Sequence, residues 1–359
     1  MNFNTRSSIR IDLRSDTATR PSAAMLARML AADVGDEQLG EDPTTRMLEE
    51  RSADLLGHEA ALFLPTGTMC NQIALLLHCR PGDEVIAARV AHIYNSEGAG
   101  AAALAGALVH PIASSNGIFT GSDLTKAVRP YRPRAPRSRL VVIEQTSNRG
   151  GGAVWPISTV RSIVEGAHAH GLSVHMDGAR LFNAVVASGT SAADFGRCCD
   201  SVWIDFSKGL GCPFGAVLAG SKSFIAEAWR WKHRLGGAMR QSGFMAAACL
   251  YALDHNVDRL AEDHSKARRF AARLFGSNGI KSPFSKVETN ILFLDFADAG
   301  VSAPAVVQEL RKQGIGLSLE GPSLARAVTH LDIGERDVEE AAEIVATTVA
   351  TLSRTIATA

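Results

Sequence analysis

The stretch that decides the fold is residues 201–215, SVWIDFSKGLGCPFG. An apolar run typical of a buried strand ends at Asp205, and Lys208 follows it in a corner that also holds Gly209 and Gly211. A lysine in such a corner has little reason to be there for packing, and an amine shielded from water is a usable nucleophile. An exposed lysine in a tight loop is the alternative for this motif taken alone.

Two other strand ends carry polar groups. Asp177 ends the apolar run 172–176 and is followed by Gly-Ala-Arg180. A carboxylate desolvated there needs a cationic partner, and a pyridinium nitrogen is one; a structural pair with Arg180 is the alternative. Gly67 and Thr68 follow the strand 60–64 and open a helix, whose free N–H groups favour an anion. Taken alone, that turn is also compatible with an ordinary strand–helix connection.

Helical and strand patterns alternate along most of the chain. The sequence predicts helices at 43–56, 67–77 and 158–170, and strands at 60–64, 85–87, 140–143, 172–176, 201–205 and 216–219. This alternation predicts an α/β fold with a mostly parallel sheet covered by helices, whose ligand sites lie at the carboxyl ends of the strands. Beyond residue 256 a second helix-and-strand pattern predicts a smaller α/β domain. We therefore expect domains at 1–255 and 256–359.

Composition excludes several classes of protein. The 359 residues include 37 basic and 37 acidic ones, so the formal net charge of zero argues against a sequence-independent nucleic-acid partner. Apolar runs fall short of the roughly 18 residues of a membrane span, and residues 1–10 lack the apolar core of a secretory signal. Six cysteines without metal-ligand spacing indicate free thiols, no metal site and a cytoplasmic location.

The three strand ends are more specific together than alone. An anion cradle, a carboxylate and a lysine amine are the groups that pyridoxal 5′-phosphate requires, because it has a phosphate, a ring nitrogen that must stay protonated and an aldehyde that binds an amine. The sequence therefore predicts this cofactor.

At this point the chain resembles the L-threonine aldolase branch of the fold-type I pyridoxal-phosphate enzymes, which are grouped with the β-eliminating lyases. The matching segments run in family order over about residues 9–335: IDLRSDTATRP, VGDEQLGEDPT, ALFLPTGTMCNQIALL, AHIYNSEGAGAAALAG, HMDGARLFNAVVA, SKGLGCPFGAVLAG, GGAMRQSG and RAVTHLDI. The resemblance implies retro-aldol cleavage of L-β-hydroxy-α-amino acids to glycine and an aldehyde. It also implies homodimers or homotetramers with shared active sites.

The resemblance also assigns roles to individual residues. Lys208 is similar to the lysine that binds the cofactor aldehyde, and Asp177 resembles the partner of the pyridine nitrogen. His92 resembles the histidine that stacks on the cofactor ring, and it is our candidate for the base, with a purely stacking ring as the alternative. Gly67, Thr68 and Arg240 resemble phosphate ligands. Ser15, Arg180 and Arg326 resemble the groups that hold the substrate carboxylate, and Arg180 also belongs to the implied cofactor set.

The chain departs from the family pattern where the substrate's β-substituent is expected. Small residues stand at Ser96 and Ser147, and Arg134 replaces a histidine that the family usually carries. We expect the small residues to admit a bulkier group such as phenyl, or Arg134 to favour an acidic one.

Three other functions remain open at this stage. The first is β-elimination or transamination with the same cofactor. The second is a nicotinamide-dependent oxidoreductase, suggested only by the loose GxGxxA at residues 98–103, which lacks a preceding buried strand. The third is a non-catalytic scaffold, against which the retained Lys208, Asp177 and Arg326 argue.

Overall fold

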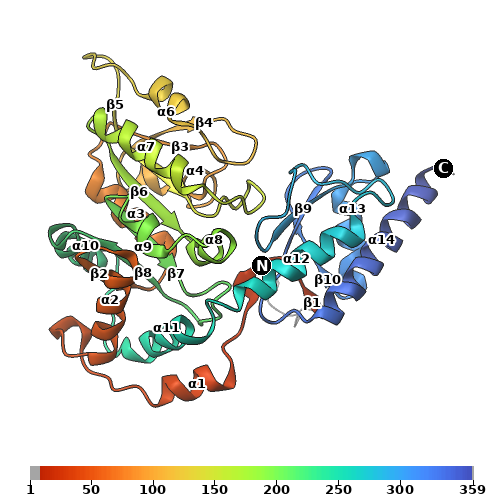
Figure 1. Ribbon diagram of the computed structural model, residues 1–359, viewed down its shortest axis with the longest axis horizontal. Coiled ribbons are helices and arrows are strands. Elements are labelled where there is room, and N and C mark those ends of the chain that lie inside the picture. The colour runs from red at the N-terminus through yellow and green to blue at the C-terminus, as the bar shows by residue number, and fades with distance from the viewer. Residues whose placement is uncertain (1–8, 358–359) are drawn as a thin grey trace. The chain divides into compact units, whose positions relative to one another are not determined.

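The computed structural model describes residues 9–357 and divides into two compact units (Figure 1). The large unit is Pro21–Asp258, and the small unit joins Arg259–Ala359 with the segment that precedes Pro21. Residues 1–8, which make up most of the N-terminal stretch used above to argue against a secretory signal, lie outside the described part.

A seven-stranded sheet forms the centre of the large unit, in the order β2-β8-β7-β6-β5-β3-β4. The strands are β2 (Ala60–Leu64), β3 (Asp83–Ala88), β4 (Leu108–Ile112), β5 (Arg137–Glu144), β6 (Ser173–Gly178), β7 (Ser201–Asp205) and β8 (Ala216–Gly220). Pairing is parallel from β4 through β3, β5 and β6 to β7, whereas β8 runs antiparallel to both β7 and β2. The predicted mostly parallel α/β sheet is confirmed.

Helices connect these strands, as the alternating pattern predicts. They are α1 (Ala23–Leu30), α2 (Pro43–Leu56), α3 (Gly67–His78), α4 (His92–Asn95), α5 (Gly100–Ala103), α6 (Gly121–Ala127), α7 (Ile157–Ala169), α8 (Leu181–Ser188), α9 (Ala192–Gly196), α10 (Lys222–Arg234) and α11 (Gly243–His255), with the short 3₁₀ helix η2 (Glu37–Leu39). α3 packs against β7 and α10, and its residues 70–75 are all buried. This burial fixes the start of α3 beside the carboxyl end of the sheet.

The small unit contains two small sheets and three long helices. Its elements are β1 (Ile11–Asp12), η1 (Asp16–Ala18), α12 (Leu260–Leu274), β9 (Ile291–Asp295), η3 (Ala297–Ala299), α13 (Ala303–Lys312), β10 (Ile315–Gly316), β11 (Ser318–Leu319), β12 (Leu324–Val328) and α14 (Glu335–Ala357). β1 pairs in parallel with β10, and β11-β12-β9 form an antiparallel sheet.

The N-terminal segment differs from the expected domain assignment. We expected residues 1–255 to form one domain, but residues 9–20 belong with the small unit. The physical reason is that Ile11 and Leu13 are buried in that unit's core, while Ile11 lies in register with Ile315. The chain passes from the large to the small unit after Asp258, close to the expected boundary at residue 255.

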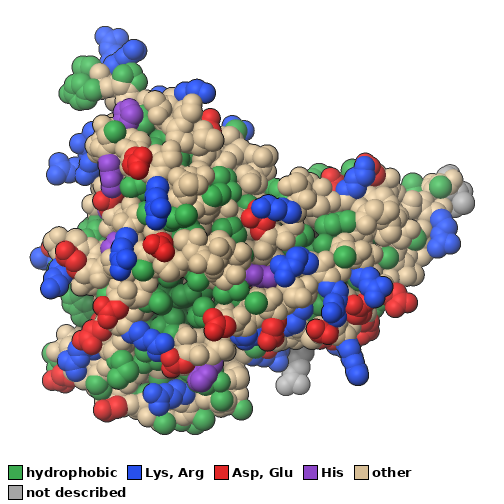
Figure 2. Space-filling view, in the orientation of Figure 1, with side chains coloured by type: hydrophobic (Ala, Val, Ile, Leu, Met, Phe, Trp, Pro, Cys, Tyr) green, Lys and Arg blue, Asp and Glu red, His purple; other side chains and the backbone are tan. Residues whose placement is uncertain are grey.

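The surface carries charges of both signs. Figure 2 shows lysine and arginine side chains interspersed with aspartate and glutamate over the visible face. Within residues 9–357, no helix is both long enough and apolar enough to cross a bilayer. The six cysteines all lie in the described part of the chain and carry free thiols, as predicted.

Candidate active site

Three neighbouring strands bring acidic groups to the carboxyl edge of the large sheet. Glu144 ends β5 and lies in register with Asp177 near the end of β6, which in turn lies in register with Trp203 of β7. Asp177 is only 2% exposed. Its Oδ2 accepts a hydrogen bond of 2.7 Å from Asn71 Nδ2, and its Oδ1 accepts one of 3.1 Å from the backbone N–H of Ala179. Asp177 is therefore a fixed carboxylate at a strand end, as the sequence predicts.

Lys208 lies three residues beyond the end of β7. Its Nζ donates to Asp205 Oδ2 and lies 5.6 Å from the ring centre of Trp203. Asp205 Oδ1 is held in turn by the backbone N–H and the hydroxyl of Ser207, at 2.9 and 2.8 Å. The amine is thus partly shielded and directed back along the strand that precedes it.

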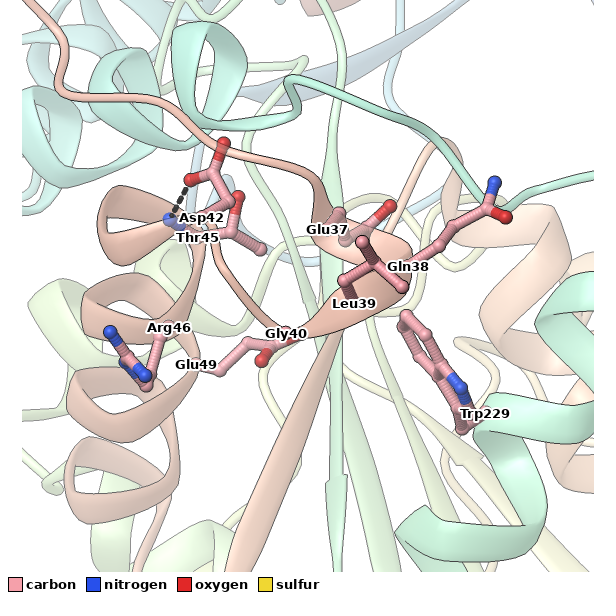
Figure 3. Close-up of a pocket in the computed structure, with 9 residues that line it drawn as sticks. All are labelled: Glu37, Gln38, Leu39, Gly40, Asp42, Thr45, Arg46, Glu49 and Trp229. Carbon is pink, nitrogen blue, oxygen red and sulfur yellow. Dashed lines mark hydrogen bonds between the residues drawn. The ribbon is translucent and has the colours of Figure 1, made fainter.

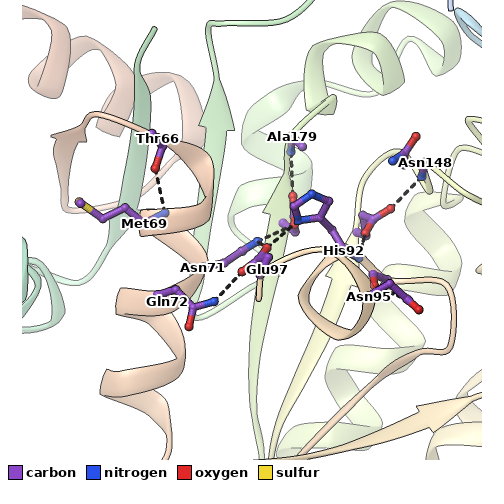
Figure 4. Close-up of polar contacts among 12 residues, drawn as sticks. Thr66, Met69, Asn71, Gln72, His92, Asn95, Glu97, Asn148 and Ala179 are labelled. Atoms are coloured by element: carbon purple, nitrogen blue, oxygen red, sulfur yellow. Dashed lines mark hydrogen bonds and ion pairs between the residues drawn. The ribbon is translucent and has the colours of Figure 1, made fainter. Parts of the chain in front are cut away.

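The start of α3 is shaped for close approach. Thr66 caps the helix, with its hydroxyl accepting from the N–H of Met69 at 3.2 Å (Figure 4). A Cβ added to Gly67 would lie 2.1 Å from the ring of Trp203, so only glycine fits there. Thr68 is exposed at the same helix start. A twelve-residue helix that begins with exposed N–H groups can hold a phosphate.

His92 opens α4 and faces the buried acidic groups (Figure 4). Its Nδ1 lies 2.7 Å from Glu97 Oε1, and its backbone N–H donates to Glu144 Oε2 at 2.5 Å. The hydrogen bond to Glu97 raises the pKa of His92 above its ordinary value. His92 and Asp177 thus lie close together, joined through Glu97 and its neighbours.

The cations near this edge do not fully offset the cost of burying its carboxyl groups. Burial raises the pKa of Asp177, and the nearby charge of Glu97 raises it further. Burial likewise raises the pKa of Glu144 to about 7, with Asp177 adding to the effect. A cationic ring nitrogen placed at Asp177 would offset these costs. The residues present therefore fit pyridoxal phosphate: a carboxylate that favours a cation, a shielded amine and a helix start without a Cβ.

Arg180 and Arg240, the other predicted ligands in the large unit, have different surroundings. Arg180, three residues after Asp177, is buried, and its backbone N–H donates to the carbonyl of Gln145 at 3.0 Å, while the backbone N–H of Gln145 donates to the carbonyl of Asp177 at 2.7 Å. Arg240 is exposed and forms a 2.8 Å ion pair with Asp36. Arg180 thus belongs to the same sheet edge as Asp177, and Arg240 is held by its ion pair.

Ser15 and Arg326, the remaining predicted ligands, belong to the small unit. Ser15 caps η1 through its hydroxyl, which accepts from the N–H of Thr17 at 3.2 Å. Arg326 lies on β12; its Nη2 donates at 3.3 Å to the carbonyl of Arg14, and its Nε lies 3.5 Å from Glu320. The small unit therefore brings Arg326 beside the segment that carries Ser15.

Comparison with known proteins follows this geometry. The family model of the beta-eliminating lyases matches residues 12–298. The chain belongs to the beta-eliminating lyase family. It is 41% identical to the low-specificity L-threonine aldolase of Escherichia coli K12, over 92% of this chain and 97% of that one. It is 40% identical to low-specificity L-threonine aldolase 1 of Arabidopsis thaliana, over 91% and 93%. The solved threonine aldolase of Leishmania major shares the fold, with a TM-score of 0.80 at 22% identity over 95% of this chain and 100% of that one.

Some positions at which this family member departs from the common pattern do not face an open site. Ser147 is buried, and a Cβ on Gly117 or Gly150 would come within 2.0 or 2.5 Å of its hydroxyl, so its side chain packs between its own loop and the segment that carries Gly117. Arg134 is exposed and precedes β5, at the opposite end of that strand from Glu144. Ser96 is exposed directly after α4. Of the three, only Ser96 lies next to a predicted site element.

Several side chains that the sequence analysis did not single out lie within the candidate site. Asn71 and Glu97 connect His92 to Asp177, and Trp203 contacts both Gly67 and Asn71. A weak signal was available, because Asn71 and Gln72 are amides inside an otherwise apolar helix. Polar side chains in such a helix are normally hydrogen-bonded when buried.

A second group of charged residues lies away from the carboxyl edge of the seven-stranded sheet. Lys232 is fully buried, donates to Glu37 and lies 5.0 Å from the ring centre of Trp229. Figure 3 shows the adjacent pocket of about 420 Å³, lined by residues including Glu37, Leu39, Glu49 and Trp229. Glu37 also accepts from the N–H of Met239 at 2.8 Å, so this cluster ties η2 to the segment that carries Arg240.

Proposed function

We propose that this chain is a pyridoxal-phosphate-dependent lyase of the L-threonine aldolase type. It cleaves the Cα–Cβ bond of L-β-hydroxy-α-amino acids and releases glycine and an aldehyde. Its curated relatives in Escherichia coli and Arabidopsis thaliana support this reaction, since they match almost their full length. The family resemblance implies pyridoxal phosphate as the cofactor, and a solved structure of the same fold is described with this cofactor bound.

One observation carries the proposal. Asp177 lies near the end of β6 and Lys208 follows the adjacent parallel strand β7, and the Trp203 ring, 5.6 Å from Lys208 Nζ, lies against Gly67 at the start of α3. Asp177 would hold the ring nitrogen of the cofactor, Lys208 its aldehyde, and the helix start at Gly67 its phosphate. When bound, the cofactor supplies an electron sink for the carbanion that bond cleavage leaves at Cα.

The chain's own residues perform the remaining tasks. Lys208 would bind the cofactor aldehyde through its Nζ amine. Asp177 keeps the ring nitrogen cationic from its buried, doubly hydrogen-bonded position. His92 takes the proton of the β-hydroxyl at Nε2, because its Nδ1 is occupied by Glu97. A positioned base of this kind contributes roughly 10²–10⁴ in rate.

Arg180 binds the substrate carboxylate, because its guanidinium can form two parallel hydrogen bonds with it. The assignment of Ser15 and Arg326 to the same carboxylate stays a prediction, as does that of Arg240 to the phosphate. Assembly into homodimers or homotetramers with shared active sites and the cytoplasmic location also stay predictions.

The test is an assay of the purified protein with pyridoxal phosphate and L-threonine, in which glycine and acetaldehyde are quantified. We expect both products in equal amounts, and a visible cofactor absorption band that Lys208→Ala abolishes together with turnover. Ammonia and a keto acid in place of glycine would favour β-elimination or transamination. A band that survives unchanged in Lys208→Ala contradicts the proposal.

The same assay with a panel of substrates addresses the β-substituent. Because Ser96 is small and exposed beside α4, we propose that L-phenylserine is accepted in preference to L-threonine. Ser96→Phe should reverse that preference, and Arg134→Ala serves as the control at the far end of β5. A preference for L-threonine over both phenylserine and an acidic analogue would contradict this specificity.

A further inference from the structure

Glu97 is a buried carboxylate with hydrogen-bond partners on both oxygens. Oε1 lies 2.7 Å from His92 Nδ1 and accepts from Asn71 Nδ2 at 2.7 Å, while Oε2 accepts from Gln72 Nε2 at 2.6 Å (Figure 4). A carboxylate only accepts, so the nitrogen of His92 that faces it carries the proton. The other ring nitrogen, Nε2, is then the basic one.

Asn71 joins this carboxylate to Asp177. Its Nδ2 donates to Glu97 Oε1 and to Asp177 Oδ2, each at 2.7 Å, which uses both of its protons. Its Oδ1 accepts from Trp203 Nε1 at 2.7 Å. Because an indole N–H only donates and carboxylates only accept, the amide has a single orientation.

The hydrogen bonds behind Asn71 are directed the same way. His175 Nε2 lies 3.2 Å from Asn71 Oδ1, and His175 Nδ1 lies 2.8 Å from the hydroxyl of Ser201, which also lies 2.8 Å from His78 Nε2. Burial lowers the pKa of His175 to about 3 and that of His78 to about 4, so both rings are neutral. Nε2 of His175 is therefore the donor to Asn71, and each link orients the next toward the two carboxylates.

We propose that Glu97 and Asn71 are positioning residues: Glu97 fixes the tautomer of His92 that leaves Nε2 basic, and Asn71 couples the protonation of His92 to that of Asp177. This inference rests on the proposed function, since it gives His92 and Asp177 their roles. Both residues act through His92 and Asp177, with which they form hydrogen bonds.

The charges around these groups set the expected directions. Glu97 raises the pKa of His92 most, and Asp177 and Glu144 raise it further, while burial lowers it. For Asp177, burial and Glu97 raise the pKa, whereas Asn71, His92 and Lys208 lower it. Loss of the Glu97 charge should lower the pKa of His92, and loss of Asn71 should raise that of Asp177.

The test of Glu97 uses the full chain with bound cofactor and ¹⁵N-labelled histidine, with His92→Asn assigning the His92 signals in the NMR spectrum. We expect the Nδ1-protonated tautomer in the unmodified protein. In Glu97→Gln the pKa of His92 should fall by roughly one unit. The acid limb of the kcat profile should move to lower pH by the same amount, and KM should change little.

The test of Asn71 compares Asn71→Leu with Gln72→Leu. Both variants remove one amide donor from Glu97, but only Asn71 contacts Asp177. We expect Asn71→Leu to weaken cofactor binding, measured by absorbance titration, by about tenfold, which corresponds to about one unit in the pKa of Asp177. Asp177 loses its charge as the pH falls, so the loss of affinity should grow as the pH of the titration is lowered. Gln72→Leu should leave cofactor affinity unchanged. If Asn71→Leu does not fold, Asn71→Ser takes its place.

Three results would overturn the inference: an Nε2-protonated His92 in the unmodified protein, an unchanged acid limb in Glu97→Gln, or equal cofactor affinities in the Asn71 and Gln72 variants. These readouts are separate from the proposed function. Absence of glycine and aldehyde from the unmodified protein would refute that function, while the tautomer and the cofactor affinity could still be measured.

Discussion

At the residue scale, buried acids are the most informative feature of this protein. Asp177 and Glu144 lie at the carboxyl edge of the large sheet. Glu49 lies in the other charged cluster, beside Lys232 and Glu37. Burial raises the pKa of Glu49 to about 7, even though its Oε1 accepts from the N–H of Phe63 at 2.8 Å. Such a group makes stability depend on pH.

Glu49→Gln tests this dependence. Between pH 4.5 and 7 the folded chain keeps a proton that the unfolded chain releases, so the stability that this proton contributes is lost as the pH rises toward 7. Glutamine retains the acceptor for Phe63 without a charge. We expect equal thermal stability near pH 4.5, and a variant more stable by on the order of 1–2 kcal/mol at pH 8. The neighbouring Glu50, which is exposed, gives the control Glu50→Gln. Parallel Tm curves for Glu49→Gln and the unmodified chain would contradict the expectation.

At the element scale, the start of α3 depends on the absence of a side chain at Gly67. A Cβ there would meet the Trp203 ring at 2.1 Å. Gly67→Ala should therefore cost about 1–3 kcal/mol through overpacking, and it should weaken cofactor binding as the helix start shifts.

Gly166→Ala provides the matched control for this substitution. Gly166 lies inside α7, where an added Cβ would meet Leu124 at an ordinary 3.6 Å. Alanine should raise stability there by roughly 0.5–1 kcal/mol. Thermal melts and absorbance titrations with cofactor measure both effects. Equal effects of Gly67→Ala and Gly166→Ala on thermal stability and cofactor affinity would contradict this expectation.

Elements were more predictable from the sequence than their contacts. The spacing of apolar residues predicted α2 at 43–56 and β7 at 201–205, and both have those bounds. The strand ends predicted Lys208 and Asp177, and the family resemblance added His92, which lies close to Asp177. The bridge through Asn71 and Glu97 was not predicted, because Asn71 and Asp177 are 106 positions apart and meet only through the order of the strands. The packing of residues 9–20 with the C-terminal elements was not predicted either, because these segments are also far apart in the sequence.

At the scale of the whole molecule, the core of the small unit contains residues from both ends of the chain. Leu13 is fully buried in it together with Phe270, Leu292 and Val345. Leu13→Ala should cost about 2–5 kcal/mol and increase hydrogen exchange in β9, β10 and α12. The strands of the large sheet should keep their protection. Leu75→Ala, in α3, should give the opposite pattern. Increased exchange in the large sheet of Leu13→Ala would show that residues 9–20 stabilise the other unit.

The pairing of β1 with β10 also has a consequence for synthesis of the protein. Ile11 leaves the ribosome long before its partner Ile315, which emerges only after about 300 further residues have been added. The continuous stretch Pro21–Asp258 can complete its sheet during translation, while the first strand must wait, unpaired, for almost the entire chain. Until then Ile11 and Leu13 are unburied apolar side chains of the nascent chain, and a chaperone that recognises short apolar segments would bind them.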